Sequence, residues 1–130
     1  MSPRQWIHSS LTTLAGGRVH QNTSIREDAS TRTMTKPFIV HRFAVDRGDL
    51  RGDDITKTYV EEVQLFVHDV PGDYTVIDGI LIAMRGLLDG RVDQPNGIIR
   101  CTWLEDSEDF RDDKMGTILR YGRYQIKHRS

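Results

Sequence analysis

The stretch TKTYVEEVQLFVH at residues 56–68, followed by DVPGDYTVIDGILIAMRGLL at 69–88, decides the fold. Val63, Leu65 and Val67 alternate with polar or mixed neighbours, which is the period of a β-strand with one buried face. The second stretch begins with a Pro-Gly turn and then spaces its apolar residues three and four apart, which is the period of an amphipathic helix. Together they predict a strand, a turn and a helix that covers the strand.

The same two periods place the remaining elements around this unit. Ser2 and Pro3 are typical of the start of a helix, and Gly16 followed by Gly17 is typical of its end. Pro37 opens a strand that we expect to pair with the 56–68 strand as a long hairpin. The other predicted elements are a helix over about 3–14, a short strand near Val19, and strands at 38–45, 98–104 and 117–128. This order predicts an α+β fold in which a mainly antiparallel sheet of about four to five strands is packed on one face by two helices.

Length and composition limit the class of protein. With 130 residues, of which 37% are hydrophobic and 28% charged, the chain fits a single domain, residues 1–130, with long polar loops at about 21–35, 46–56 and 105–115. The single cysteine, Cys101, excludes an internal disulfide framework and a cysteine-based zinc finger. No apolar run reaches the roughly 18 residues of a membrane span, so we expect no membrane partner.

The net charge of −1 averages over an uneven distribution. Residues 1–43 carry six Lys and Arg against two acids, residues 44–113 carry seven against seventeen acids, and residues 114–130 carry five and no acid. This order suits contacts between oppositely charged surfaces, including those of copies of the same chain, although a solvated surface explains each cluster as well. The acidic middle argues against a dedicated binder of duplex DNA. The candidate interface residues are the acids Asp46, Asp49, Asp53, Asp54, Glu105, Asp106, Glu108, Asp109 and Asp112, and the bases Arg120 and Arg123.

We find no motif for catalysis, metal binding or a cofactor in the sequence. His41 and His68 fall on strands that we expect to pair, so they lie either side by side, where an aspartate could complete a metal site, or on opposite faces. The aspartates of 46–54 miss the ligand spacing of a calcium loop. Cys101 lies in the middle of a strand and is interpreted as a buried, inert thiol. We therefore predict no cofactor, no metal and no enzymatic activity.

The segment Arg120-Tyr121-Gly122-Arg123-Tyr124 mixes cations with aromatic rings. Platforms that bind single-stranded nucleic acid use this combination. Packing in a core and at a sheet edge explains the same pattern, and we prefer that interpretation.

In the order of its elements, the chain resembles the tail terminator proteins of long-tailed bacteriophages, which are small tail-completion or minor tail proteins. The resemblance covers nearly the full chain. The matching stretches are Leu14-Ala15-Gly16-Gly17-Arg18-Val19, Pro37-Phe38-Ile39-Val40-His41, Val63-Gln64-Leu65-Phe66-Val67 before the helix at 77–88, and Tyr121-Gly122-Arg123-Tyr124-Gln125-Ile126. Other head–tail joining (head-closure) proteins and tail tube proteins share this size and composition and are the alternative. A small enzyme or ligand-binding domain is a third possibility.

The resemblance implies an assembly protein of the virion and not an enzyme. Tail terminators form a hexameric ring that caps the tail tube, ends its polymerisation and provides the interface to the head–tail connector. The implied partners are copies of the chain itself, the tail tube protein and the head-closure or connector protein, while genomic DNA passes through the lumen without specific binding. The implied location is the tail–neck region of the virion, and the host cytoplasm during assembly. The candidate residues would then lie at these contacts or face the lumen, where carboxylates repel DNA phosphates.

Overall fold

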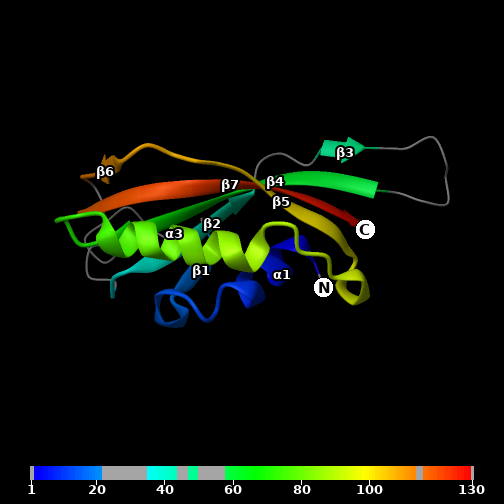
Figure 1. Cartoon of the computed structure of the whole chain (residues 1–130), viewed down its shortest axis with the longest axis horizontal. Coiled ribbons are helices and arrows are strands. Elements are labelled where there is room, and N and C mark those ends of the chain that lie inside the picture. The colour runs from blue at the N-terminus through cyan, green and yellow to red at the C-terminus, as the bar shows by residue number, and fades with distance from the viewer. Residues whose placement is uncertain (1, 22–34, 44–46, 50–57, 114–115, 130) are drawn as a thin grey trace.

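The computed structural model describes residues 2–21, 35–43, 47–49, 58–113 and 116–129 (Figure 1). A twisted sheet runs along the molecule, with its main strands in the order β1-β2-β4-β7-β5; two three-residue strands extend it, β3 beside β4 and β6 beside β7. The strands are β1 (Val19–Gln21), β2 (Phe38–Phe43), β3 (Arg47–Asp49), β4 (Thr58–Asp69), β5 (Ile98–Asp106), β6 (Phe110–Asp112) and β7 (Thr117–Arg129). The helices are α1 (Pro3–Ser10) and α3 (Thr75–Leu88), with single 3-10 turns η1 (Ala15–Gly17) and η3 (Gln94–Asn96). The predicted α+β class is confirmed.

All strand pairs are antiparallel except β1 with β2, so the mainly antiparallel sheet is also confirmed. The predicted long hairpin is the pair β2 and β4, whose register runs from Phe38↔His68 to Phe43↔Val63. In β4, alternation directs Val63, Leu65 and Val67 to one face, where they are fully buried.

The last strand of the chain, β7, lies in the centre of the sheet. It pairs with β4 from Thr58↔Arg129 to Asp69↔Ile118 and with β5 on its other side. Because β7 is antiparallel to both neighbours, β4 and β5 run in the same direction, and α3 is the crossover between them. The sheet is therefore completed only when the C-terminal strand enters the gap between β4 and β5.

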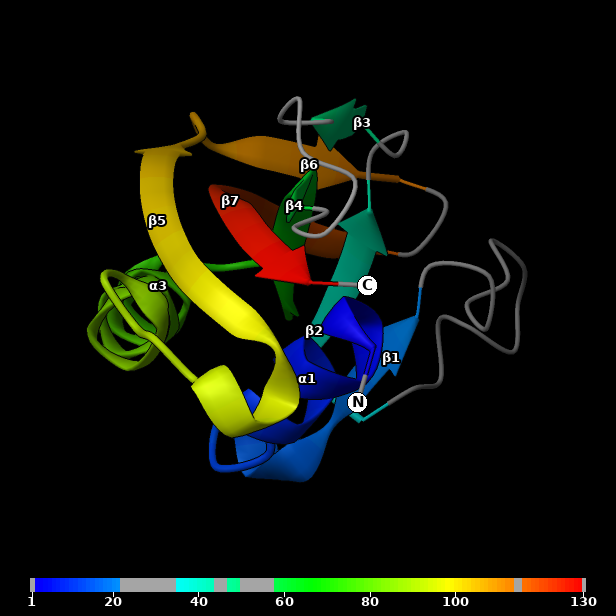
Figure 2. The ribbon, with the colours of Figure 1, turned by 90° about the vertical axis from the view of Figure 1, so that its right-hand side faces the viewer.

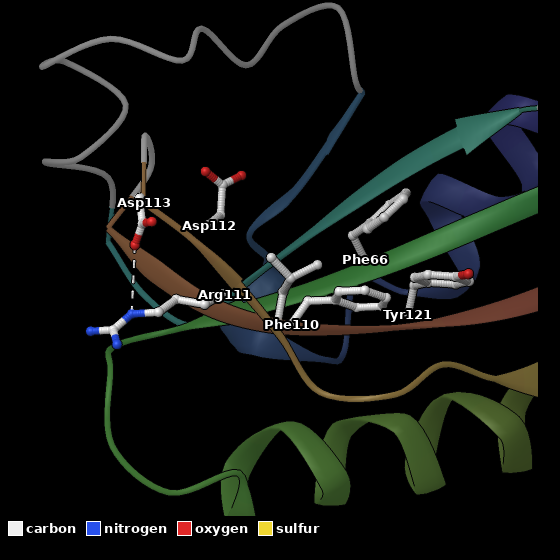
Figure 3. Close-up of a pocket in the computed structure, with 7 residues that line it drawn as sticks. Phe66, Phe110, Arg111, Asp112, Asp113 and Tyr121 are labelled. Atoms are coloured by element: carbon white, nitrogen blue, oxygen red, sulfur yellow. Dashed lines mark ion pairs between the residues drawn. The ribbon is translucent and has the colours of Figure 1, made fainter.

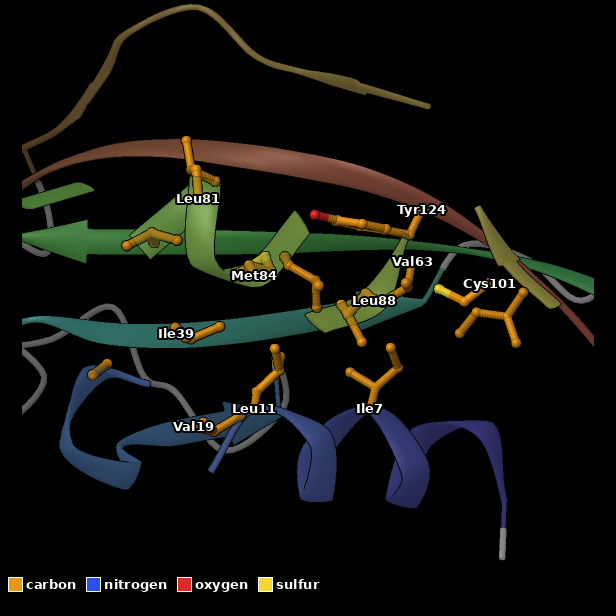
Figure 4. Packing of buried hydrophobic residues seen from close by; sticks show 14 of the residues in the cluster. Ile7, Leu11, Val19, Ile39, Val63, Leu81, Met84, Leu88, Cys101 and Tyr124 are labelled. Carbon is orange, nitrogen blue, oxygen red and sulfur yellow. The ribbon is translucent and has the colours of Figure 1, made fainter. Parts of the chain in front are cut away.

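Both helices cover the same face of this sheet, as predicted (Figure 2). In Figure 4, Ile7 and Leu11 from the α1 side point toward Met84 and Leu88 of α3, with Val63 of β4 nearby. These side chains belong to one buried cluster, and Leu65 and Leu81 are also buried in it, as the strand and helix periods predict. Burial of this apolar area is the main stabilising contribution to the fold.

The N-terminal helix is held by a capping box and by its one large aromatic residue. The Ser2 hydroxyl accepts a hydrogen bond from the Gln5 amide at 3.2 Å, and the Ser2 amide donates to Gln5 Oε1 at 3.0 Å. The buried Trp6 indole donates to Asp93 Oδ2 at 3.0 Å, which ties α1 to the segment between α3 and β5. The helix ends at Ser10 and not at Leu14, because Leu11 already has cap geometry.

The predicted polar loops are corrected in two places. Residues 47–49 within the 46–56 loop form β3, which pairs with β4, and the 105–115 loop contains the end of β5 and all of β6. Most of the 21–35 loop lies outside the described residues. Acidic composition alone predicted a loop at 105–115, but residues 105–106 and 110–112 pair with the long strand β7. No helix among the described residues has the length and apolar character needed to span a membrane.

Candidate interaction surfaces

The Arg120–Tyr124 segment lies in the middle of β7, where alternation divides its side chains between two faces. Tyr124 is fully buried on the helix-covered face, whereas Tyr121 lies on the opposite face, called the open face below. A Cβ atom at Gly122 would lie 3.1 Å from Tyr124 Cε2 and 3.2 Å from Asp106 Oδ1, so glycine makes room for the Tyr124 ring. The two tyrosines therefore do not form one stacking platform for nucleic acid, in agreement with the packing interpretation.

Arg120 joins three elements within the subunit. Its Nη1 lies 2.6 Å from Asp78 Oδ1 on α3, and its Nε lies 3.6 Å from Asp109 Oδ1 and donates to the Ser107 carbonyl at 3.1 Å. The side chain is 23% exposed, so these pairs are partly shielded from water. The role of Arg120 in this structure is to fix α3 and the β5–β6 connection to β7.

Arg123 has the corresponding role on the open face. Its guanidinium pairs with Glu62 of β4 and with Glu105 of β5, so one side chain links three adjacent strands. The hydrogen bonds that Arg123 donates to Glu62 and Glu105 raise the pKa of Arg123 above its ordinary value. Carboxylates of the same subunit thus pair with both Arg120 and Arg123, and their place at an interface stays a prediction.

The acids predicted as interface or lumen residues come from several separate stretches of the chain. Asp46, Asp53 and Asp54 lie outside the described residues, and Asp49 ends β3. Glu108 is exposed in the connection between β5 and β6.

The acids at 105–112 have structural partners that a loop assignment missed. Asp106 Oδ1 accepts a hydrogen bond from Trp103 Nε1 at 3.0 Å, and Asp109 pairs with Arg120. Asp112 is half-buried in β6, opposite Thr117 of β7. Within the described chain these acids therefore divide between the helix side, β6 and solvent, and they do not form a continuous acidic patch.

The open face also contains an apolar recess that the sequence did not predict (Figure 3). Its volume is about 460 Å³. The Phe66 and Phe110 rings lie 5.1 and 6.1 Å from the Tyr121 ring, and the exposed Arg111–Asp113 ion pair is at the rim. The lining residues are Phe66, Phe110, Arg111, Asp112, Asp113, Leu119 and Tyr121. An apolar floor with a charged rim suits an inserted apolar side chain of another protein better than it suits a reaction centre.

The histidines that could have met at a metal site lie on opposite faces. His41 is fully buried under α1, where its Nε2 is 3.4 Å from His8 Nδ1, and its own Nδ1 has no hydrogen-bond partner among the residues that the structure describes. His68 stacks on Phe38 and shares a 2.8 Å hydrogen bond with the Thr117 hydroxyl. Within the described residues, no three His, Cys, Asp or Glu side chains are placed to hold a metal ion together.

Burial disfavours the charged form of each of these buried groups. Burial lowers the pKa of His41 to about 4, helped by the nearby His8, Arg4 and His20, and burial also lowers the pKa of His68 to about 4 against the opposing charge of Asp112. Burial raises the pKa of the Cys101 thiol to about 12, which supports the interpretation of an inert thiol.

The outward side of α3 is the second surface that sequence reasoning missed. Ile82 is 74% exposed and Val76 is 47% exposed, while Ile77, Leu81, Met84 and Leu88 on the other side of the helix are buried. The signal was present in the sequence, because 75–88 contains only two charged residues and thus lacks a full polar face.

Comparison with known proteins supports the fold. No protein-family model matches the sequence. No curated protein matches it either. Among solved structures, the chain is similar to a protein in the virion of a native gene transfer agent (GTA) particle, with a TM-score of 0.66 and 10% sequence identity, covering 95% of this chain and 92% of that chain. At this identity the likeness establishes a shared fold, and the shared fold extends over nearly all of both chains.

Proposed function

We propose that this chain is a structural protein of a phage-like virion and that it acts there as a tail terminator, a ring that caps the tail tube and receives the head–tail connector. The main support is the full-length likeness to a protein of a gene transfer agent virion, with a TM-score of 0.66. The resemblance of the element order to tail terminators, noted from the sequence, is independent support.

The side chains of the described residues favour assembly over catalysis. Arg120 and Arg123 bind carboxylates of their own subunit and stabilise the sheet. Exposed apolar side chains include Ile82 on α3 and Phe110 at the recess. Exposed apolar surface of this kind is typical of sites that contact other proteins.

A ring also accounts for the uneven charge of the chain. Rings are built from heterologous contacts, in which two different surfaces of one subunit meet in the assembly. Residues 44–113 are strongly acidic and the terminal regions are basic, so such a contact can be electrostatically complementary. Acids left facing the lumen would repel DNA phosphates and let the genome pass.

The direct test is tube growth in vitro. Tail tube protein from the same particle is polymerised with and without this chain, and the tubes are measured by negative-stain electron microscopy. We expect shorter tubes with an added ring at one end, in proportion to the amount of chain added. Tubes that grow to the same length with bare ends would contradict the proposal.

The same images separate the alternatives. Incorporation along the whole tube would identify a tail tube protein, and binding to isolated connectors without binding to tubes would identify a head-closure protein. A variant in the recess, Phe110→Ser, and the matched surface variant Glu108→Gln show whether the recess takes part, because only the first changes its apolar lining.

A further inference from the structure

The outward side of α3 is apolar where a surface helix is normally polar. Ile82 and Val76 flank a strip of small residues, Gly79, Ala83 and Gly86, that is exposed to solvent. A Cβ atom at Gly79 or Gly86 would have no neighbour within 4 Å, so the glycines leave space for something outside the subunit to approach the helix backbone. A helix that is apolar on both sides is typical of a buried position.

Other exposed apolar side chains lie close to α3 in the chain. Val70 precedes the helix, Val92 follows it, and Leu104 lies on β5, a strand that α3 contacts. Apart from Phe110 of the recess, the large apolar residues exposed in the described part of the chain are these three and the two on α3. These exposed apolar residues lie on α3, in the segments on either side of it, or on a strand that it contacts, and this part of the molecule is called the helix flank below.

Charge indicates what covers the helix flank. Residues 70–93, which contain α3 and the segments on either side of it, carry four Asp against two Arg. The described residues 2–21 and 35–43 carry Arg4, Arg18, Lys36 and Arg42 and no acid. Two helix flanks placed against each other would bring acids together, which is unfavourable, whereas the basic region has the complementary sign.

α1 and α3 cover different strands of the sheet, and they approach each other where Trp6 of α1 donates to Asp93. α3 contacts β4, β5 and β7, whereas α1 lies over β2, next to the outermost strand β1 (Figure 2). The edge formed by α1, β1 and β2 is called the basic edge below. Arg4 is exposed on the helix side of this edge, with its guanidinium 5.0 Å from the centre of the Phe43 ring, and Arg42 is exposed on the opposite face of β2.

We propose that the helix flank of one subunit packs against the basic edge of a second copy of this chain. This inference rests on the proposed function at one point, which is that a capping ring needs a repeated contact between subunits. Arginine side chains suit such a contact because their aliphatic stems cover apolar surface while their guanidinium groups reach carboxylates. Since the two surfaces differ, each added subunit leaves one of each free, and the contact repeats until the ring closes.

The test uses two variants, each of which disables one side of the contact. Ile82→Arg puts a cation on the helix flank, and the double variant Arg4→Glu/Arg42→Glu reverses the basic edge. Both replace exposed side chains, and a glutamate at residue 4 lies in the first turn of α1, where a negative charge is favourable, so both variants should fold. The matched control is Arg100→Glu, a charge reversal at an exposed residue of β5.

Sedimentation velocity at protein concentrations up to about 1 mM gives the readout. We expect the wild type and Arg100→Glu to self-associate, and each of the two interface variants to do so at least tenfold more weakly. A one-to-one mixture of the two variants should form a heterodimer and nothing larger, because one intact helix flank then meets one intact basic edge.

Three results would overturn the inference. They are a wild type that stays monomeric throughout, an Ile82→Arg variant that associates like the wild type, and a double variant that still dimerises alone, which indicates contact between two helix flanks. Tube capping is scored separately on the same proteins. Capping of tubes by the Ile82→Arg variant would refute this contact and leave the proposed function standing. The expected self-association without any capping of tubes would support the contact and refute the proposed function.

Discussion

On the helix-covered face of the sheet, β4 and β7 present Val63, Leu65 and Ile126, all fully buried beneath α1 and α3. One residue along the same strands, on the open face, Glu62 pairs with Arg123 and Phe66 lines a recess that is open to solvent. The backbone is shared, so the difference comes from what covers each face. This difference indicates that the stability of the fold depends on the covered face. The open face and the outer side of α3 remain accessible to other proteins.

The largest effect should come from truncating the covered face. Leu65→Ala should lower the free energy of unfolding by about 2–5 kcal/mol, because it removes fully buried methyl groups and leaves a cavity. Gln64→Ala, its neighbour on the open face, should change it by less than about 0.5 kcal/mol. Urea unfolding measures both variants, and a loss below about 1 kcal/mol for Leu65→Ala would contradict the assignment of the faces.

The second effect is a loss of stability in acid that involves both faces. His41 and His68 have a pKa of about 4 in the folded chain, whereas an unfolded histidine titrates near 6.5. Between these values the unfolded chain binds more protons, so the free energy of unfolding falls as the pH falls from 6.5 to 4. The loss is up to about 3 kcal/mol for each histidine.

Urea unfolding at several pH values tests this loss, and an NMR titration assigns it. Two imidazole signals should shift with midpoints near pH 4. His68→Gln should reduce the pH dependence of stability between 6.5 and 4. An unchanged slope in that variant, or normal titration of both signals, would contradict the burial described for these rings.

A smaller effect should follow from removing the polar anchor of α1. Asp93→Ala leaves the buried Trp6 indole N–H without its acceptor, which should cost about 1–3 kcal/mol. Glu108→Gln, a change at an exposed acid, is the matched control and should be nearly neutral. Thermal unfolding compares the two, and equal midpoints would show that the indole finds another acceptor.

The smallest effect is expected from the ion pairs of the open face. Arg123→Met should cost no more than about 1 kcal/mol, because the pairs with Glu62 and Glu105 are partly solvated. High salt should reduce the difference from wild type, since salt screens the pairs. Urea unfolding at low and high salt measures it, and a cost above about 2 kcal/mol would place Arg123 among the residues that determine the fold.

Local patterns predicted the elements and their buried faces well. The alternation in 56–68 and the helical spacing in 75–88 gave the buried residues Leu65 and Leu81, and Ser2 identified the start of α1. The insertion of β7 between β4 and β5 depends on long-range pairing, which local patterns do not contain.

The candidate site was less predictable for a related reason. Glu105 and Asp106 appeared to be loop acids by composition, yet pairing with β7 makes them strand residues with partners at Arg123 and Trp103. The recess forms only where β4, β6 and β7 meet, so no single stretch of sequence indicates it. The apolar outer side of α3 could have been predicted from the sequence, because residues 75–88 contain too few charged residues for a polar face.

Electron cryomicroscopy of tail tubes incubated with this chain tests the central claim most directly. The account predicts a ring of copies at one tube end, with the α3 flank of each copy facing the α1–β1–β2 edge of the next. Tube ends without the chain, while the chain remains dispersed in solution, would contradict it.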